Sequence, residues 1–478
     1  MVEERKRHCW ECLRRSLVCD FTRPQCTRCS TAGVACPGYG ATEPRRLKWL
    51  PPGKVTSRRQ KKPVEHEVKG TGCSRGLARE LPTDLHVFVQ ATEYYNACIY
   101  PDLRHIATLG RNTAIYPITP EIVQMAMARH PDHIRMVIVC MTLSHRMNRL
   151  RNEPGSQALV RDFFRYRGQL IRSLSDDIQA PERRTSDLVV AGMLTLLLVD
   201  AQQGASPHWR CHLDGVRKII DLRGGICVMA RSPGLRPLLL FVVFAAIMGD
   251  TSSPSSQLSL ATSDMRALVV MITKHADHPF AFGTYPAALF REILNINYLR
   301  VKALEGASGD LIQSAFEILA RIHSFCVAQW AQSISTNSDW ELLGAIHQDA
   351  IAIYCIFSLQ SLGVLPWNTQ LGDLRTSHAH SLQQGLTAAV SSPCLKRFVG
   401  WDLVVLGVAA VKDTRLQAFL RHQLPCLSYS MGTHVPLLAK GLLEKFWALK
   451  STHKTWDQCF DQPYTFAMHM SVDVSGVR

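Results

Sequence analysis

Apolar residues recur every three or four positions along three segments beyond residue 84, which is the spacing of one face of a helix. The three stripes are Trp209, Leu213, Val216 and Ile220; Ala315, Leu319, Ile322, Cys326 and Trp330; and Leu342, Ile346, Ala350, Ile353 and Phe357. No series of alternating strand residues with hairpin turns appears in the sequence. The pattern predicts an all-α array of paired helices whose apolar faces form the core.

Residues that begin and end helices stand beside two of these stripes. Ser206 followed by Pro207 is typical of a helix start, and Gly224-Gly225 of a helix end. Ser338 and Glu341 have the spacing of a capping box ahead of the third stripe. The serine-rich stretch 251–259 is a candidate division of the helical region.

The two longest apolar runs, Leu238–Met248 and Leu403–Val411, are shorter than the ~18 residues that a membrane span needs. We therefore interpret both as buried core segments. The first seven residues carry charges of both signs, and no apolar stretch follows them. The sequence thus predicts neither a membrane span nor a secretory signal, and we expect the protein to stay inside the cell.

Composition is that of a globular protein with a basic excess, since 46% of the 478 residues are hydrophobic and the net charge is +15. The length exceeds the ~250 to 300 residues at which one core stops growing, so we expect two or more units. Residues 1–80 hold 18 Lys and Arg against 8 Asp and Glu. A basic amino-terminal segment on a nearly neutral remainder indicates a segment that binds nucleic acid or an acidic surface. A solubilising or targeting tail is the alternative.

Six of the 16 cysteines lie within 28 residues, in the spacing C-x2-C-x6-C-x6-C-x2-C-x6-C. They are Cys9, Cys12, Cys19, Cys26, Cys29 and Cys36. An intracellular chain keeps its thiols reduced, so the clustering favours Zn2+, which prefers four sulfur ligands, over disulfides. Six cysteines complete two tetrahedra only if two sulfurs bridge both metals. The count predicts a two-zinc cluster, and a segment this short is expected to fold only with metal.

Other residues stand at fixed places among the cysteines, in Cys9-Trp-Glu-Cys12, Arg14-Arg15 and Cys19-Asp-Phe-Thr-Arg-Pro-Gln-Cys26-Thr-Arg-Cys29. With Cys36, this segment resembles the fungal Zn2Cys6 binuclear-cluster family of transcription factors over residues 8–40. The resemblance implies that Cys9 and Cys26 are the bridging sulfurs, and that Asp20 and Arg23-Pro24 belong to the loop between two short helices. It also implies that the first helix enters the major groove of double-stranded DNA and reads a short G/C-rich triplet.

In that family, basic residues between the second and third cysteines contact the bases, and Arg15 and Ser16 hold those positions here. Arg15 can pair with guanine O6 and N7, and a serine hydroxyl can pair with several bases. Ser16 and Leu13 stand where the family commonly has basic residues, so we expect a weaker or altered triplet preference. Three further arginines are candidates for phosphate contacts, which position a protein without specifying sequence, or else form a solvated face. They are Arg14, Arg23 and Arg28.

Residues 41–83 are rich in proline, glycine and basic residues, and their composition predicts a flexible basic linker. Two basic clusters, 11 residues apart, have the pattern of a bipartite nuclear-import signal; phosphate contacts and a solvated linker are the alternatives. The clusters are Arg45 and Arg46, then Arg58, Arg59, Lys61 and Lys62. Pro51, Pro52 and Pro63 interrupt any heptad pattern, so no coiled coil is evident. We expect a monomer, or dimerisation through the downstream region.

A second segment, from Trp209-Arg-Cys-His212-Leu through Gly215 to Arg223-Gly-Gly225, carries its own signature. It is similar to the fungal-specific transcription factor domain that accompanies binuclear zinc clusters, with Val216 where alanine is more common. The resemblance implies that residues 84–470 form a large helical regulatory domain. In such proteins this domain modulates activity and binds partners or a metabolite.

The sequence offers no support for an enzyme. His208 and His212 have the spacing of metal ligands on one helix face, but no glutamate follows His208 and no third ligand is evident. His378 and His380 would diverge on a helix. The ten cysteines outside the cluster form no CxxC pair, and neither GxSxG nor GxGxxG occurs.

These observations together predict a nuclear, zinc-dependent, sequence-specific DNA-binding regulator of RNA polymerase II transcription in a fungus. Its helical domain would communicate with the transcription machinery or co-regulators. By the habits of the family, we expect control of one metabolic pathway or gene cluster. The rival hypothesis is a zinc-stabilised protein-interaction module, in which Leu13 and Ser16 mark weak or lost DNA reading.

Overall fold

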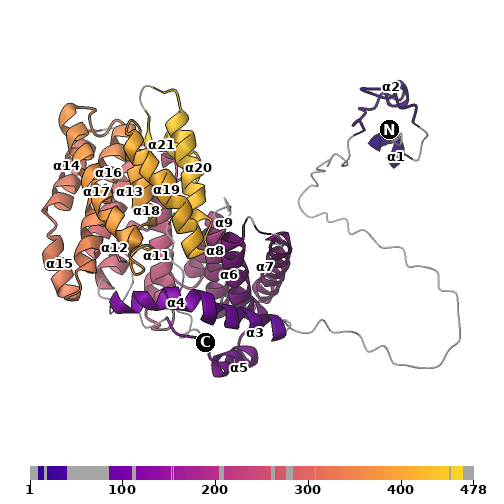
Figure 1. Ribbon diagram of the computed structural model, residues 1–478, viewed down its shortest axis with the longest axis horizontal. Helices are drawn as coiled ribbons and strands as arrows, with labels where there is room; N and C mark the ends of the chain where they lie inside the picture. Colours follow the sequence, from indigo (N-terminus) through magenta and orange to yellow (C-terminus); the bar gives the residue numbers. More distant parts are fainter. Residues whose placement is uncertain are drawn as a thin grey trace. The chain divides into compact units, whose positions relative to one another are not determined.

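The computed structural model of the chain describes residues 9–15, 19–39, 85–109, 115–151, 153, 156–203, 209–259, 264–275, 284–306, 308–451 and 454–466. The chain divides into two compact units, Met1–Leu77 and Ala78–Arg478. Within the described ranges every regular element is a helix and none is a strand (Figure 1). The predicted all-α class is confirmed.

The first unit contains two short helices, α1 (Trp10–Arg14) and α2 (Thr27–Thr31). A loop connects them, in which the Arg23-Pro24 peptide bond is cis and Phe21 has a positive φ of 61°. The cysteines themselves form the small core of this unit, with Phe21, Val34 and Tyr39 packed against them. An apolar core of that size cannot hold a fold together without further bonds.

The second unit consists of helices throughout its described residues. The first part comprises α3 (Leu85–Tyr94), the π-helix η1 (Tyr95–Ile99), α4 (Tyr100–Leu103), the 3-10 helix η2 (Arg104–Leu109), α5 (Pro120–Arg129), α6 (Asp132–Arg149), α7 (Ser156–Gln179), α8 (Asp187–Gln202), α9 (Trp209–Leu222), α10 (Ile226–Met229) and α11 (Arg236–Thr251). The second part comprises the 3-10 helix η3 (Ser255–Gln257), α12 (Met265–Lys274), α13 (Ala287–Ala303), α14 (Gly309–Ser324), α15 (Val327–Ile334), α16 (Asp339–Ser361), α17 (Thr369–Ser391), α18 (Gly400–Ala409), α19 (Thr414–Met431), α20 (Val435–Ala448) and α21 (Trp456–Cys459).

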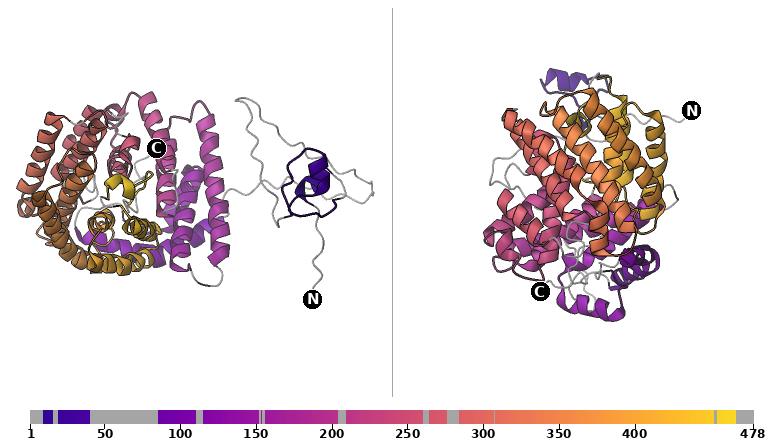
Figure 2. Two further views of the ribbon diagram at one scale, coloured as in Figure 1. Left: turned by 90° about the horizontal axis from the view of Figure 1, so that it is seen from above. Right: turned by 90° about the vertical axis from the view of Figure 1, so that its left-hand side faces the viewer.

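Two groups of helices pack around different centres in this unit. α6 lies against α3, α7 and α8, while α16 lies against α13, α14, α17 and α18. α11 contacts both α8 and α13 and so joins the two groups. Figure 1 shows the first group in purple and the second in orange, and Figure 2 shows the same packing from two further directions. One continuous apolar core runs through both groups.

The central helix α16 differs from its predicted form. The sequence indicated one apolar face, but nearly every position from Ile346 to Gln360 is buried because helices cover α16 on several sides. The helix is long and apolar enough to cross a membrane, yet 78% of its most apolar window is buried among its neighbours. The capping-box prediction is wrong, since Ser338, the residue before α16, has helical backbone angles and its side chain makes no capping hydrogen bond.

The stripe in α9 is confirmed. Its predicted core residues Trp209, Leu213, Val216 and Ile220 are all buried. The helix ends at Leu222, and Gly224 and Gly225 follow with φ angles of 87° and 93°, which favour glycine. Ser206, Pro207 and His208 lie outside the described residues, so the predicted start of this helix is not described.

The stripe that begins at Ala315 extends over two helices. Ala315, Leu319 and Ile322 are buried on α14, which ends at Ser324. Cys326 is exposed and precedes α15, which continues at an angle of 57° to α14. The periodic spacing of apolar residues was therefore correct for each helix but did not reveal the bend between them.

The serine-rich stretch 251–259 does not divide the helical unit. Thr251, Ser252, Ser253 and Ser255 are buried, and Arg300 donates hydrogen bonds to the Ser253 carbonyl at 2.7 Å and to Asp457 at 3.2 Å. These polar contacts connect α13, the stretch after α11 and the start of α21. The serines satisfy a buried arginine inside one unit.

Candidate metal centre and nucleic-acid interface

Both CxxC pairs of the first unit adopt the same local structure. Cys9 precedes α1 and Cys26 precedes α2, and each sulfur accepts a hydrogen bond of 3.3 Å from the amide of the second cysteine of its pair, Cys12 or Cys29. A helical turn brings residues three apart onto one face. Each short helix thus directs two sulfurs inward.

The six sulfurs form two groups of four that share two members. The groups are Cys9, Cys12, Cys19 and Cys26, and Cys9, Cys26, Cys29 and Cys36; within each, all sulfurs lie within 4.8 Å of one another. The Sγ atoms of Cys9 and Cys26 are 3.6 Å apart. Tetrahedral zinc with Zn–S bonds of about 2.3 Å requires sulfurs about 3.8 Å apart. The donor set therefore fits metal ions, and Cys9 and Cys26 are the two sulfurs positioned to bridge.

The electrostatics of the cluster also favour a cation. Burial raises the pKa of the Cys9, Cys12 and Cys29 thiols, the last to about 12. Burial also opposes ionisation of Cys19, but hydrogen bonds from backbone amides and from the Tyr39 hydroxyl outweigh it and lower the Cys19 pKa to about 6. Ionising all these buried sulfurs without a cation would place several thiolates close together, where they repel one another. A bound divalent metal removes that repulsion, since a coordinating thiol is deprotonated.

Asp20 organises the loop between the two helices. Its carboxylate accepts hydrogen bonds from the Thr27 amide at 2.9 Å and from the Thr22 hydroxyl at 3.0 Å. The side chain of Thr27 lowers the pKa of Asp20 most, and the Thr22 hydroxyl and the Thr27 amide lower it further. The resemblance placed Asp20 in this loop, and the structure shows that it fixes the first turn of α2.

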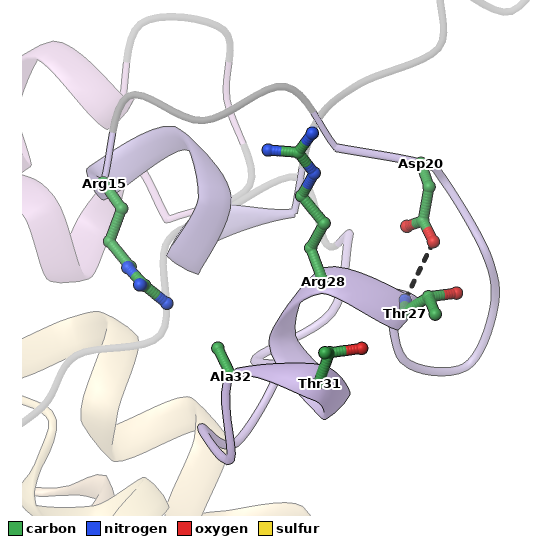
Figure 3. Close-up of a pocket in the computed structure, with 6 residues that line it drawn as sticks. All are labelled: Arg15, Asp20, Thr27, Arg28, Thr31 and Ala32. Atoms are coloured by element: carbon green, nitrogen blue, oxygen red, sulfur yellow. Dashed lines mark hydrogen bonds between the residues drawn. The ribbon is translucent and has the colours of Figure 1, made fainter.

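A hollow of about 430 Å3 lies beside the cluster, between the end of α1 and α2. Arg15, Asp20, Thr27, Arg28, Thr31 and Ala32 line it (Figure 3). The close-up shows Arg15 extending from the end of α1 and Arg28 from α2. Both arginines are exposed. Two guanidinium groups and two threonine hydroxyls around one hollow can bind phosphate oxygens or the edges of bases.

The structure brings together only some of the predicted DNA contacts. Arg15 and Arg28 share the hollow, whereas Arg23 is exposed and lies over the Tyr39 ring, 5.5 Å from its centre. Arg14 belongs to α1, but its side chain lies outside the described part, as does Ser16. The predicted nuclear-import residues, Arg45, Arg46, Arg58, Arg59, Lys61 and Lys62, also lie outside the described residues.

Thr27 and Thr31 also belong to this surface, which the cysteine spacing and the family resemblance did not indicate. They lie four apart on α2 with Arg28 between them, so one helix face carries both hydroxyls beside the guanidinium. Thr27 lies inside the second CxxC pair and Thr31 two residues after it, and this spacing is a signal that could have indicated the face.

Of the pair considered as metal ligands, His208 lies outside the described residues and only His212 is described. His212 Nε2 lies 3.0 Å from a carboxylate oxygen of Asp200, which also pairs with Arg167. His212 is therefore part of a partly buried polar network between α7, α8 and α9. Its role in the structure is packing of the helical unit.

Comparisons with known proteins agree on the class of protein that this chain is similar to. Residues 93–472 match the family described as fungal specific transcription factor domain. The chain is 44% identical over 483 residues to the phomenoic acid biosynthesis cluster-specific transcriptional regulator of Leptosphaeria maculans, covering 99% of this chain and 92% of that protein. No solved structure matches the chain.

Proposed function

The chain belongs to the fungal-specific transcription factor domain family, and from that premise we propose that it is a zinc-dependent, sequence-specific DNA-binding regulator of RNA polymerase II transcription. The family and the similar regulator make it a transcriptional regulator and not an enzyme. By its similarity to a cluster-specific regulator, we propose that it controls one biosynthetic gene cluster and acts in the nucleus.

The observation that carries the proposal is the pair of four-sulfur groups that share Cys9 and Cys26. In this function each group holds one Zn2+ and the shared sulfurs bridge the two ions. Zinc supplies the folding energy that the small core lacks, since structural zinc contributes on the order of 10 to 16 kcal/mol of apparent binding free energy. α1 and α2 then become a rigid support for the side chains around them.

DNA reading is assigned to the hollow between α1 and α2. Arg15 would pair with guanine in the major groove, and Arg28, Thr27 and Thr31 would contact phosphates. Arg14, Ser16 and Arg23 remain proposed contacts from the sequence. The binding site would be a G/C-rich triplet.

The remaining parts of the proposal concern the other partners. Residues 41–83 would carry the nuclear-import signal and residues 84–470 would form the regulatory domain that contacts transcription machinery or co-regulators. No coiled coil is evident in the sequence, so the DNA-binding unit is proposed to act as a monomer or to depend on the helical unit for pairing.

The experiment that tests this function is a random-library DNA selection with the zinc-loaded full chain, run at fixed salt beside a Cys26→Ala variant. We expect enrichment of a G/C-rich triplet that disappears in the variant. A control at Cys426, which is exposed in α19, should enrich the same site as the wild type when changed to alanine. Absence of enrichment with zinc still bound would favour the zinc-stabilised protein-interaction module.

A prediction for two arginines follows from their different roles. On the selected site, Arg15→Ala is expected to cost roughly 1 to 3 kcal/mol and to relax specificity, because it removes a base contact. Arg28→Ala should weaken binding to all sequences alike and reduce the salt slope by about 1. Binding titrations at several salt concentrations measure both effects, with Arg161→Ala on α7 as the control. An Arg15 variant with an unchanged specificity ratio would refute base reading by this residue.

A further inference from the structure

Three helices of the second unit bring two histidines and a carboxylate together at one place. His323 lies at the end of α14, Asp349 in α16 and His378 in α17. The Nε2 atoms of His323 and His378 are 3.0 Å apart, and Nδ1 of His378 lies 2.8 Å from Oδ1 of Asp349. These residues are distant in sequence, so only the packing of the three helices creates the arrangement.

Asp349 determines which nitrogen of His378 carries a proton. A carboxylate accepts hydrogen bonds, so the neighbouring Nδ1 of His378 carries the hydrogen and its Nε2 carries a lone pair. That lone pair is directed toward Nε2 of His323. In metal sites of proteins, a ligating histidine commonly donates a hydrogen bond from its other ring nitrogen to a carboxylate, which orients the ring.

The distances fit a metal ion between the two rings. Zinc with Zn–N bonds of about 2.0 to 2.1 Å and tetrahedral angles places two ligand nitrogens roughly 3.3 Å apart. The observed separation of 3.0 Å is that of a hydrogen bond between the two rings, and it has to widen by a few tenths of an ångström to admit the ion. The ring planes are 9° apart and the ring centres are 5.1 Å apart, so the two rings lie nearly parallel.

We propose that His323 and His378, oriented by Asp349, form a metal site on the helical unit that binds a divalent ion such as Zn2+. The site is separate from the cysteine cluster. Two imidazole nitrogens supply the protein ligands, and water completes the coordination, because His323 is exposed to solvent. His378 and Asp349 are mostly buried, at 15% and 14% exposure, so one side of the site is held firmly by the bundle.

Two other histidine and carboxylate pairs in the described part of the unit lack the feature that makes this a binding site. His347 hydrogen-bonds Asp402 through Nδ1, but its Nε2 faces the Thr284 hydroxyl at 3.0 Å, and the whole group is buried. His212 faces Asp200 through its Nε2. Only at His323 and His378, among these pairs, do two imidazole nitrogens face each other within reach of solvent.

Binding an ion here would have a structural consequence. The ion would connect the end of α14 to α17 beside the central helix α16. A ligand that binds only the folded state stabilises it in proportion to the logarithm of its concentration above Kd. Excess zinc should therefore raise the unfolding midpoint of the helical unit.

The test uses the full chain without a polyhistidine tag, titrated with Co2+ as a probe for Zn2+ and then with Zn2+ itself. Cobalt bound to cysteine gives intense sulfur-to-metal charge-transfer bands, and cobalt bound to histidine and water does not. The wild type is expected to take up one more ion per chain than a His323→Ala/His378→Ala variant. The charge-transfer bands of the two proteins are expected to be identical, because both keep the cysteine cluster. His380→Ala, an exposed histidine on the same helix, should retain the extra ion.

Asp349→Asn supplies a second test that leaves both ligands in place. The loss of the carboxylate partner is expected to weaken the extra site 10- to 100-fold, as for other metal sites whose orienting carboxylate is removed. Circular dichroism of each variant without added metal shows whether the helices are intact, and exposed His323 can be changed alone if the double variant unfolds. Equal stoichiometry in the wild type and in the variants that lack His323 or His378 would overturn the proposal, whatever the cysteine cluster binds.

Discussion

The pKa of a buried ionisable residue depends on contacts that its neighbours in sequence do not reveal. His145 is fully buried in α6, and its Nδ1 lies 3.0 Å from the Tyr94 hydroxyl. Burial, reinforced by nearby Arg149 and Arg397, lowers the pKa of His145 to about 4. Burial likewise lowers the pKa of Arg397 to about 10, since only Asp102, at 3.6 Å, offsets it. This part of the core is therefore sensitive to acid.

The pH dependence of His145 can be predicted with its sign. The folded pKa of about 4 lies below the ordinary value of 6.5. As pH falls below 6.5 the unfolded chain binds a proton that the folded chain excludes, so stability is lost between pH 6.5 and 4. The loss from this residue is about 3 kcal/mol at the lower limit. Above pH 6.5 it contributes no pH dependence.

Denaturant unfolding at pH 7.5 and pH 4 measures this loss. In His145→Gln, which keeps a polar side chain of similar size, the decrease in unfolding free energy between the two pH values should be smaller than in the wild type by that amount. His380→Gln, at an exposed position, is the matched control and should behave as the wild type does. An equal decrease in all three proteins would contradict the assignment.

Contacts between elements depend on where small residues stand. The apolar run Leu238–Met248 forms most of α11, as predicted, and all but one of its side chains are buried. Gly249 follows it, and a Cβ atom at this position would overlap the indole of Trp209 from α9. Trp209 is buried and also donates a hydrogen bond to the Pro463 carbonyl at 3.2 Å. The close approach of α9 and α11 therefore requires glycine at this one position.

Gly249→Ala should destabilise the helical unit by about 1 to 3 kcal/mol, because a buried indole has to shift to make room. Gly441 in α20 is the matched control, since a Cβ atom there would meet nothing within 4 Å. Gly441→Ala should stabilise the unit by roughly 0.5 to 1 kcal/mol, because alanine loses less conformational entropy in a helix. Urea unfolding monitored by tryptophan fluorescence compares the two. Equal effects of both substitutions would show that the α9–α11 contact is looser than described.

At the scale of the whole molecule, each of the two units is stabilised by a different kind of core. The helical unit has a large apolar core and buried polar networks such as that of Arg300 and Asp457. The first unit has a core made of five buried cysteines with a few side chains around them. A core this small predicts that the first unit depends on bound metal for its stability, whereas the large apolar core supports the second unit.

Removal of metal should affect the two units unequally. After treatment with a strong chelator, amides in residues 9–39 should lose protection against hydrogen exchange, and amides in α11 and α16 should keep it. Cys12→Ala should have the same effect as the chelator, whereas the exposed Cys426→Ala should have none. Hydrogen exchange followed by mass spectrometry resolves the two regions. Protection of residues 9–39 that survives chelation would contradict a metal-dependent fold.

The sequence by itself determined the features that depend on neighbours along the chain. Metal ligands within one helical turn are close together in any fold, so the CxxC spacing sufficed to predict the grouping of Cys9, Cys12, Cys26 and Cys29. Helical periodicity is equally local, and it identified the α9 stripe and the all-α class. The shared position of Cys9 and Cys26 followed from the family resemblance and agrees with the two sulfur groups.

Tertiary structure alone decided the features that depend on partners distant in sequence. The burial of α16 on almost all sides, the bend before α15 and the polar network around the serine-rich stretch each arise from helices that pack from elsewhere in the chain. The hollow between Arg15 and Arg28 exists because the cysteines hold α1 and α2 together. His323, Asp349 and His378 meet because α14, α16 and α17 pack together. Side-chain spacing along one helix carries no information about which other helix lies against it.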